Sequence, residues 1–392
     1  MKSWMKFFKM FFKMKSKSDE KIESEFGKLL SEKLKIFLIL TFQLIIFPPF
    51  HLLVQAQTLM HKLPVEVIDT GGTLLLSDSP EYVRRDGILY TDTVSGDARI
   101  FFYHLNDTTE RKKIAVIVEN VSDKSTTVEI SRGAFAAPSE NYFAVGKSIQ
   151  EIYMQDNLHD SFKLKSRERK ILQPEMDLTV INPANLACGV YDFYSKQPVQ
   201  IFVLMYPADS EPLNFLMTAD ILPKDEHRLR GTFKRCNRSI KLQKIFNPAD
   251  GIGYILICDD VNDTFKKGID ATDNSEVVNA GNYGINYTLD FQTKKLTRFY
   301  LCPLGGIYAG AVKFKCNDGF GVIPTPQDKL FFGEKTPPES ESVRIAREEG
   351  LAFFTNALEI SELGNFSGRI FFEYSPPGAS NLPIQIILFP AE

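Results

Sequence analysis

The densest group of polar residues lies between positions 259 and 276, where carboxylates and amides follow one another closely. Calcium takes six to eight oxygen ligands, and a loop of this composition can supply most of them. The spacing does not fit an EF-hand, because neither Asp259 nor Asp260 is followed by a glycine at the sixth position and a glutamate at the twelfth. The simpler interpretation is a solvated loop between two strands. The calcium hypothesis names these ligands: Asp259, Asp260, Asn262, Asp263, Asp270 and Asp273.

Cysteines are five, an odd number, so at least one thiol stays free or pairs with another molecule even in an oxidising compartment. A turn with the sequence NPADG lies between Cys236 and Cys258 and would bring them to similar levels of one hairpin. These two residues are the candidate disulfide. The alternative is that most of the cysteines are small buried residues, which we expect of Cys188 and Cys258 on their strands.

Other signatures of catalysis are incomplete or absent from the sequence. Gly146-Lys147-Ser148 resembles the end of a phosphate-binding loop, but Asn141 stands where the first glycine is needed, so a surface turn is expected. No Gly-x-Ser-x-Gly, His-Glu-x-x-His or Cys-x-x-Cys motif occurs. The sequence therefore assigns no catalytic residue. A pair of carboxylates that meets only in the fold, as in a glycosidase, is left open.

Aromatic residues offer a second kind of binding surface. The chain has 32 Phe and 14 Tyr but a single Trp, at position 4. Carbohydrate-binding β-sandwiches stack sugars on exposed aromatic rings, although aromatic residues that alternate along strands more often belong to the core. The candidate stacking residues are Tyr103, Tyr283, Tyr287 and Tyr308.

The charge of the chain is unevenly distributed. Of 46 basic and 49 acidic residues, positions 1–56 hold ten and five, so the remaining 336 residues hold 36 and 44. Nucleic-acid binding needs clustered Lys and Arg to neutralise phosphates, and an acidic body argues against it. We expect no nucleic-acid partner.

The basic segment 1–56 has the organisation of an export signal. A Lys-rich region precedes the apolar run 36–47, and Val54-Gln55-Ala56 is a typical cleavage sequence. Twelve apolar residues suit a signal peptide better than a bilayer span, which needs about 20. The leader of 35 residues is longer than usual, and an over-extended gene start is the alternative explanation. Without cleavage the same segment would be a single-pass anchor with the body outside, and the only part in contact with the membrane.

The remaining residues alternate between short runs rich in Val, Ile, Phe, Tyr and Thr and turns rich in Gly, Pro, Asn and Asp. Residues 114–120 and 125–131 read as a hairpin, and only 212–218 and 342–349 read as short helices. This pattern predicts an all-β protein with two β-sandwich domains, immunoglobulin-like or jelly-roll-like. The proline-marked link 222–227 divides them into residues 57–222 and 223–392.

Four segments resemble a group of secreted bacterial proteins of unknown function that are often labelled copper amine oxidase-like. These segments are IDTGGTLLLSDSPEYV (68–83), RIFFYHLNDT (99–108), GNYGINYTLDF (281–291) and FFEYSPPGASNLPIQIILFPAE (371–392). The resemblance extends over residues 65–392. It implies a secreted β-protein and no particular activity.

The copper amine oxidase label can be tested on chemistry. Those enzymes need three copper-binding histidines, two of them as His-x-His, and a tyrosine within Thr-x-x-Asn-Tyr-Asp/Glu. Here Asn282-Tyr283-Gly284 keeps only Asn-Tyr, no His-x-His occurs, and no histidine follows Tyr283. We therefore reject amine oxidation and interpret this sequence as a turn that enters a strand.

The sequence as a whole predicts a non-catalytic, exported protein of the cell envelope or the medium with a structural or adhesive role. Its partners would be envelope components or another protein. A module that binds carbohydrate, or another ligand with the help of calcium, is the first alternative. A glycosidase-like enzyme with a carboxylate pair is the second.

Overall fold

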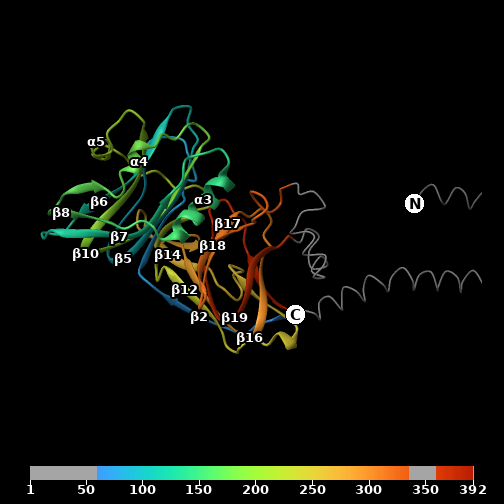
Figure 1. Ribbon diagram of the computed structural model, residues 1–392. Helices are drawn as coiled ribbons and strands as arrows, with labels where there is room; N and C mark the ends of the chain where they lie inside the picture. The colour runs from blue at the N-terminus through green and yellow to red at the C-terminus, as the bar shows by residue number, and fades with distance from the viewer. Residues whose placement is uncertain (1–59, 335–358, 392) are drawn as a thin grey trace, which may run out of the picture. The chain divides into compact units, whose positions relative to one another are not determined.

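The computed structural model describes residues 60–334 and 359–391, which belong to one compact unit, Leu59–Glu392. The proposed signal or anchor segment 1–56 and the expected helix 342–349 lie outside the described residues. Within the described ranges no helix has the length and apolar character needed to span a membrane. Strands dominate and build two mixed sheets, of eleven and nine strands, so the prediction of an all-β sandwich fold is confirmed (Figure 1).

Two long antiparallel strands form the centre of the eleven-stranded sheet. Strand β5 (Gly87–Asn106) pairs with β10 (Leu186–Pro207) over almost its whole length, from Leu105 opposite Leu186 to Gly87 opposite Met205. The other strands of this sheet are β3 (Thr73–Ser77), β4 (Tyr82–Val83), β6 (Lys112–Asn120), β7 (Thr126–Phe135), β8 (Asp160–Leu164), β9 (Arg169–Ile171), β11 (Arg230–Lys234), β14 (Lys266–Asp270) and β15 (Ser275–Asn279).

The expected hairpin at residues 114–131 is wrong, although both of its strands exist. Strands β6 and β7 do not pair with each other; each pairs with a different part of β10, Val116 opposite Val203 and Ile130 opposite Phe193. Because β10 is 22 residues long, one of its edges has room for both shorter strands in succession.

The nine-stranded sheet is built around β16 (Asn286–Pro303), which pairs with β19 (Ser361–Tyr374) and with β20 (Ile384–Pro390). Its other strands are β1 (Met60–Lys62), β2 (Val65–Thr70), β12 (Asn237–Leu242), β13 (Ile252–Ile257), β17 (Gly310–Cys316) and β18 (Gly319–Thr325). Burial alternates along β12, as expected for a strand with one face on a core. Aromatic side chains fill this core, with ring centroids 5.3–6.0 Å apart among Phe291, Phe299 and Phe372.

The two sheets do not correspond to two consecutive halves of the chain. Strand β3 pairs with β11, with Leu76 opposite Gly231, and β2 pairs with β12, with Ile68 opposite Ser239. In β5, Phe101 and Tyr103 face one core while Ile100 and Phe102 face the other. The link at 222–227 therefore does not separate the two sheets. In each sheet, strands that precede the link in the sequence form backbone hydrogen bonds with strands that follow it.

Among residues 60–334 and 359–391 the helices are short except for α3 (Tyr142–Gln155), which was not expected from the sequence. It begins at Asn141, whose side chain accepts from the amide of Ala144, and it lies beside β17 and β18 (Figure 1). The expected surface turn at Gly146-Lys147-Ser148 is wrong, since it lies inside this helix. Lys147 is buried, and its Nζ donates to the carbonyl of Pro326 at 2.6 Å.

The remaining helices are small. They are α4 (Glu175–Leu178), α5 (Pro212–Leu216) and a 3-10 turn, η1 (Pro248–Asp250). Helix α5 confirms the short helix expected at 212–218.

Candidate functional site

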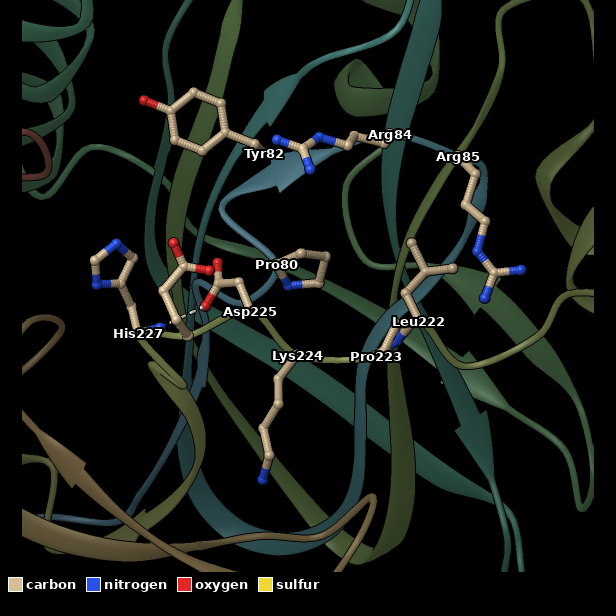
Figure 2. Close-up of a pocket in the computed structure, with 10 residues that line it drawn as sticks. Pro80, Tyr82, Arg84, Arg85, Leu222, Pro223, Lys224, Asp225 and His227 are labelled. Carbon is tan, nitrogen blue, oxygen red and sulfur yellow. Dashed lines mark hydrogen bonds between the residues drawn. The ribbon is translucent and has the colours of Figure 1, made fainter.

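The link after Leu222 folds against the segment that follows β3, and Asp225 fixes the two together. Its carboxylate accepts hydrogen bonds from Ser79 Oγ and the Glu81 amide, both at 2.8 Å. It also accepts from the amide of His227 at 3.1 Å (Figure 2). The amide of Arg228 donates to the same oxygen at 3.1 Å. Four donors hold this carboxylate, so Asp225 has a structural role in shaping the loop.

The buried side chain of Arg230 also connects the same two segments. Arg230 Nη1 donates to the carbonyls of Leu222, Leu89 and Ser79 at 2.9, 3.0 and 3.3 Å. Its Nε donates to Asp270 Oδ2 at 3.1 Å, and both side chains are almost fully buried. One guanidinium group, that of Arg230, therefore joins both segments to Asp270 at the end of β14 (Lys266–Asp270).

His104 supports the segment that carries the two carboxyl groups described below. Its Nδ1 lies 2.9 Å from the Pro80 carbonyl and its Nε2 lies 2.8 Å from Ser77 Oγ. A carbonyl oxygen only accepts, so Nδ1 of His104 donates to it. In a neutral imidazole the other nitrogen, Nε2, then accepts a hydrogen bond from the hydroxyl of Ser77. Burial lowers the pKa of His104 to about 4, which keeps the ring neutral at pH 7.

The folded link opens a first hollow of about 380 Å³ with a mixed lining of cations, carboxylates and apolar groups (Figure 2). Lys224 is engaged with Asp273 at 2.6 Å, and Arg84 with Asp107 at 2.8 Å. The lining comprises Pro80, Tyr82, Arg84, Arg85, Leu222, Pro223, Lys224, Asp225, Glu226 and His227.

A second hollow, of about 410 Å³, shares His227 with the first and has a different chemistry. Aromatic rings and carboxyl groups line it together, with an amide and a serine at one side. The lining comprises Asp78, Glu81, Phe101, Tyr103, His227, Leu229, Tyr283, Gly378, Ala379, Ser380 and Asn381. All of these except His227 and Leu229 come from the four segments that carry the resemblance to secreted bacterial proteins.

The pKa values of both carboxyl groups of the second hollow are raised. Burial, followed by the negative charges of Glu81 and Asp225, raises the pKa of Asp78 well above its usual value. Burial also raises the pKa of Glu81, with His227 opposing and Asp225 adding to the effect. Asp78 Oδ1 is buried and has no hydrogen-bond partner in the described part of the protein. The hollow thus contains a carboxyl group whose pKa is raised and which has an unused, buried polar atom.

Of the four candidate stacking tyrosines, two line this hollow and two do not. Tyr283 is half-buried there and donates its hydroxyl to the Ser380 carbonyl at 2.8 Å. Tyr103 lies beside Gly378 and is only 7% exposed. Tyr287 and Tyr308 are fully buried in the core, so their expected role as exposed platforms is wrong. The expected turn at Asn282-Tyr283-Gly284 is confirmed, with left-handed φ angles of 53° at Asn282 and 75° at Gly284.

The six candidate calcium ligands lie in two turns at opposite ends of β14. In the first turn Asp259 accepts from the amides of residues 261–263, Asp260 from the Phe265 amide, and Asp263 pairs with Arg238. In the second turn Asp270 and Asp273 pair with Arg230 and Lys224. Asn262 donates to Asp259 and accepts from Lys62. Protein donors already serve these carboxylates, and calcium binding by the six stays a prediction.

Residues 60–334 and 359–391 contain no group of three or more His, Cys, Asp or Glu side chains arranged to hold a metal ion.

All five cysteines are free in the structure, and the candidate disulfide between Cys236 and Cys258 is not formed. Strands β12 and β13 make no hairpin: β12 pairs with β2 and β16, and β13 with β1 and β20. Cys258 instead contacts the Tyr287 hydroxyl, with Sγ and oxygen 3.4 Å apart. The expectation that Cys188 and Cys258 are buried residues is confirmed.

Thiol labelling checks this arrangement. We expect the denatured protein to take up five alkyl groups with or without prior reductant, because no thiol is consumed in a bridge. In the native protein Cys316 should react first, since the other four are buried. Mass spectrometry of the labelled peptides measures both. Protection of Cys236 and Cys258 that reductant removes would contradict the structure.

The sequence analysis missed Asp78, Glu81, Asp225 and His227 as members of one site. They stand apart in the sequence, and none forms a recognised motif with its neighbours. The available signal was indirect, because Asp78 and Glu81 fall within the segment 68–83 that resembles the secreted proteins. The link 222–227, expected as a boundary between domains, lines the first hollow and contributes His227 to the second.

Comparison with known proteins leaves the chain without an assigned family. No family model matches it. No curated protein matches it either. Among solved structures, the CUB1-EGF-CUB2 domain of human MASP-1/3 is 11% identical, with 83% of this chain and 99% of that chain covered and a TM-score of 0.17. Vicilin from Solanum lycopersicum (tomato) is 10% identical, covers 80% and 84%, and has a TM-score of 0.14. Similarities this weak carry no argument about function.

Proposed function

We propose that this chain is an exported, non-catalytic binding protein whose second hollow takes a neutral, hydroxyl-rich ligand of the carbohydrate class. A structural or adhesive role at the cell envelope would follow from such binding. The export rests on the basic leader and apolar run of residues 1–56, and kinship with the secreted bacterial proteins rests on the four resembling segments. The observation that carries the binding is the buried, unpartnered Oδ1 of Asp78.

The chemistry of the lining supports an uncharged ligand. A protonated carboxyl group both donates and accepts hydrogen bonds, as a sugar hydroxyl does, whereas an ionised one only accepts. The raised pKa values of Asp78 and Glu81 favour that form. Tyr103 and Tyr283 add aromatic surface, and the exposed side chain of Asn381 adds a donor and an acceptor. Aromatic surface with a few convergent polar groups is the usual lining of a small-ligand site.

Substitution of Asp78 tests the proposal. We expect Asp78→Ala to weaken binding of a neutral oligosaccharide about fivefold, since one buried hydrogen bond contributes about 1 kcal/mol. Asp78→Asn should retain binding, because the carboxamide also both donates and accepts. A neutral glycan array identifies the probe and calorimetry measures its affinity. Glu226→Gln, confined to the first hollow, is the control. Equal affinity in all three variants would refute the proposal.

A glycosidase is the second candidate function, because the two hollows contain carboxyl groups whose pKa values are shifted in opposite directions. Asp78 and Glu81 favour the protonated form of a general acid. Asp225 favours the ionised form: burial acts to raise its pKa, but the hydrogen bonds from Glu81, Ser79, Arg228 and His227 lower it.

The same variants separate the two functions. In a glycosidase Asp78→Asn would abolish hydrolysis of the bound oligosaccharide while leaving its affinity intact, since a carboxamide cannot transfer the proton. In a binding protein neither the wild type nor the variant hydrolyses it. Release of reducing ends over time distinguishes these outcomes.

A further inference from the structure

A third cleft, of about 410 Å³, lies where the two sheets meet, between β11 and β14 of one and β2 and β12 of the other. Five of its lining residues are basic and one is acidic, on a body in which acidic residues outnumber basic ones. The lining comprises Asp69, Thr232, Lys234, Arg235, Arg238, Thr264, Phe265, Lys266, Lys267, Gly268 and Ile269. The cleft is therefore a local reversal of the charge of the molecule.

Two of the five cations form a fixed floor. The side chains of Arg238 and Lys266 are 5% and 8% exposed, and both contact Asp69: Arg238 Nε at 2.7 Å and Lys266 Nζ at 2.6 Å. Arg238 also pairs with the buried Asp263. These two cations are balanced by two carboxylates and held in place by them.

The other three cations of the cleft are not neutralised by a carboxylate among the described residues. Lys234, Arg235 and Lys267 are exposed, and none of them has a carboxylate partner in the described part of the chain. They lie on strand ends or next to them rather than on a long loop. Each pair of like charges in the cleft is unfavourable until an anion lies between them.

The backbone that carries Arg235 is held firmly. Arg235 adopts a left-handed φ of 61° at the point where the chain leaves one sheet for the other. The next residue, Cys236, donates its amide to the Gly72 carbonyl at 2.9 Å and accepts from the Asn286 amide at 3.0 Å. The cations are thus presented on ordered backbone, which reduces the entropy lost when a ligand binds.

We propose that this cleft binds a phosphate or sulfate group, either as the free ion or as an ester on a larger molecule. The planar guanidinium of Arg235 offers paired donors that match the oxygens of such a group, and the two lysines add point charges. The net acidic body disfavours nucleic acid as the carrier, because a long polyanion would contact the surrounding surface as well. This site is separate from the proposed carbohydrate site and does not depend on it.

Titration with three probes tests the inference: inorganic phosphate, inorganic sulfate and dextran sulfate. The variant Lys234→Gln/Arg235→Gln/Lys267→Gln is expected to weaken binding at least tenfold, and added salt should weaken binding to the wild type. The control is Lys124→Gln/Lys163→Gln/Lys165→Gln, which removes the same charge from exposed residues elsewhere and should bind as the wild type does. Calorimetric melting verifies that both variants fold.

The outcomes separate the sources of the ligand. Binding of the inorganic ions supports a free anion, and binding of dextran sulfate alone supports an esterified polymer. Equal weakening in both triple variants would overturn the proposal in favour of general electrostatic attraction, and so would the absence of saturable binding to any probe. Tighter binding of a single-stranded DNA oligonucleotide than of dextran sulfate would overturn the choice of carrier.

Discussion

Arg230→Met is expected to lower the free energy of unfolding by about 3–5 kcal/mol, because it leaves the buried carboxylate of Asp270 without its principal partner. It also removes the donor that serves the carbonyls of Leu222, Leu89 and Ser79. Urea denaturation followed by circular dichroism measures the loss. The same variant should weaken ligand binding in the second hollow, since the two segments that shape it lose their common anchor.

The matched control is Arg84→Met, which removes an arginine from an ion pair of good geometry on the surface. Arg84 and Asp107 are 2.8 Å apart, but their side chains are 79% and 40% exposed. Exposed pairs contribute little because water and salt screen the two charges, so the change should be small. A loss below about 1 kcal/mol in Arg230→Met would contradict the role assigned to the buried pair.

His104 should make the protein sensitive to acid. Its pKa is lowered in the native state, so between the unfolded and native values the unfolded chain binds the proton more strongly, and stability falls as pH falls. A native pKa of about 4 against about 6.5 in the unfolded chain makes this loss on the order of 3 kcal/mol. His104→Gln should be less stable than the wild type near pH 7.5 but should show a flatter profile between pH 6.5 and 4. Denaturation curves at several pH values measure both.

The pKa of Asp78 is shifted in the opposite direction to that of His104, so the two groups change stability with pH in opposite ways. Its pKa is raised in the native state, so its contribution to stability is complete below the unfolded value near 3.8 and is lost as pH rises through the native value. Asp78→Asn should therefore steepen the loss of stability on acidification, whereas His104→Gln should reduce it. If both variants change the profile in the same direction, at least one of the two assignments of protonation is wrong.

The strands could be predicted because the pattern that indicates them lies in residues close together in the sequence. The alternation in β7 and β12 needs only neighbouring residues, and both strands exist. The failure at α3 was avoidable, since Val145, Ile149 and Tyr153 recur at helical spacing after the cap at Asn141. Pairing was not predictable, because β6 and β7 look like a hairpin but find better partners in successive parts of β10.

The candidate site was less predictable than the fold. Asp78, Asp225 and Tyr283 lie on segments whose meeting depends on strand pairing across the link, and no local pattern records that meeting. The cysteines show the same limit: a turn between Cys236 and Cys258 suggested a hairpin, but the two flanking strands pair elsewhere. The acidic cluster was visible in the sequence, yet its carboxylates turned out to be engaged by Arg238, Arg230 and Lys224.

The sequence by itself determined the strand-rich class, the separation of a basic segment 1–56 from an acidic body, and the small number of histidines, five in all. Each depends only on composition or on near neighbours along the chain. Tertiary structure alone decided that the link at 222–227 lines the first hollow and contributes His227 to the second, and that Asp78 and Glu81 line that second hollow together. It also decided that three unpaired cations share one cleft. The reason is physical: burial, pKa and charge repulsion depend on distances in space, which long-range strand pairing fixes and local sequence does not.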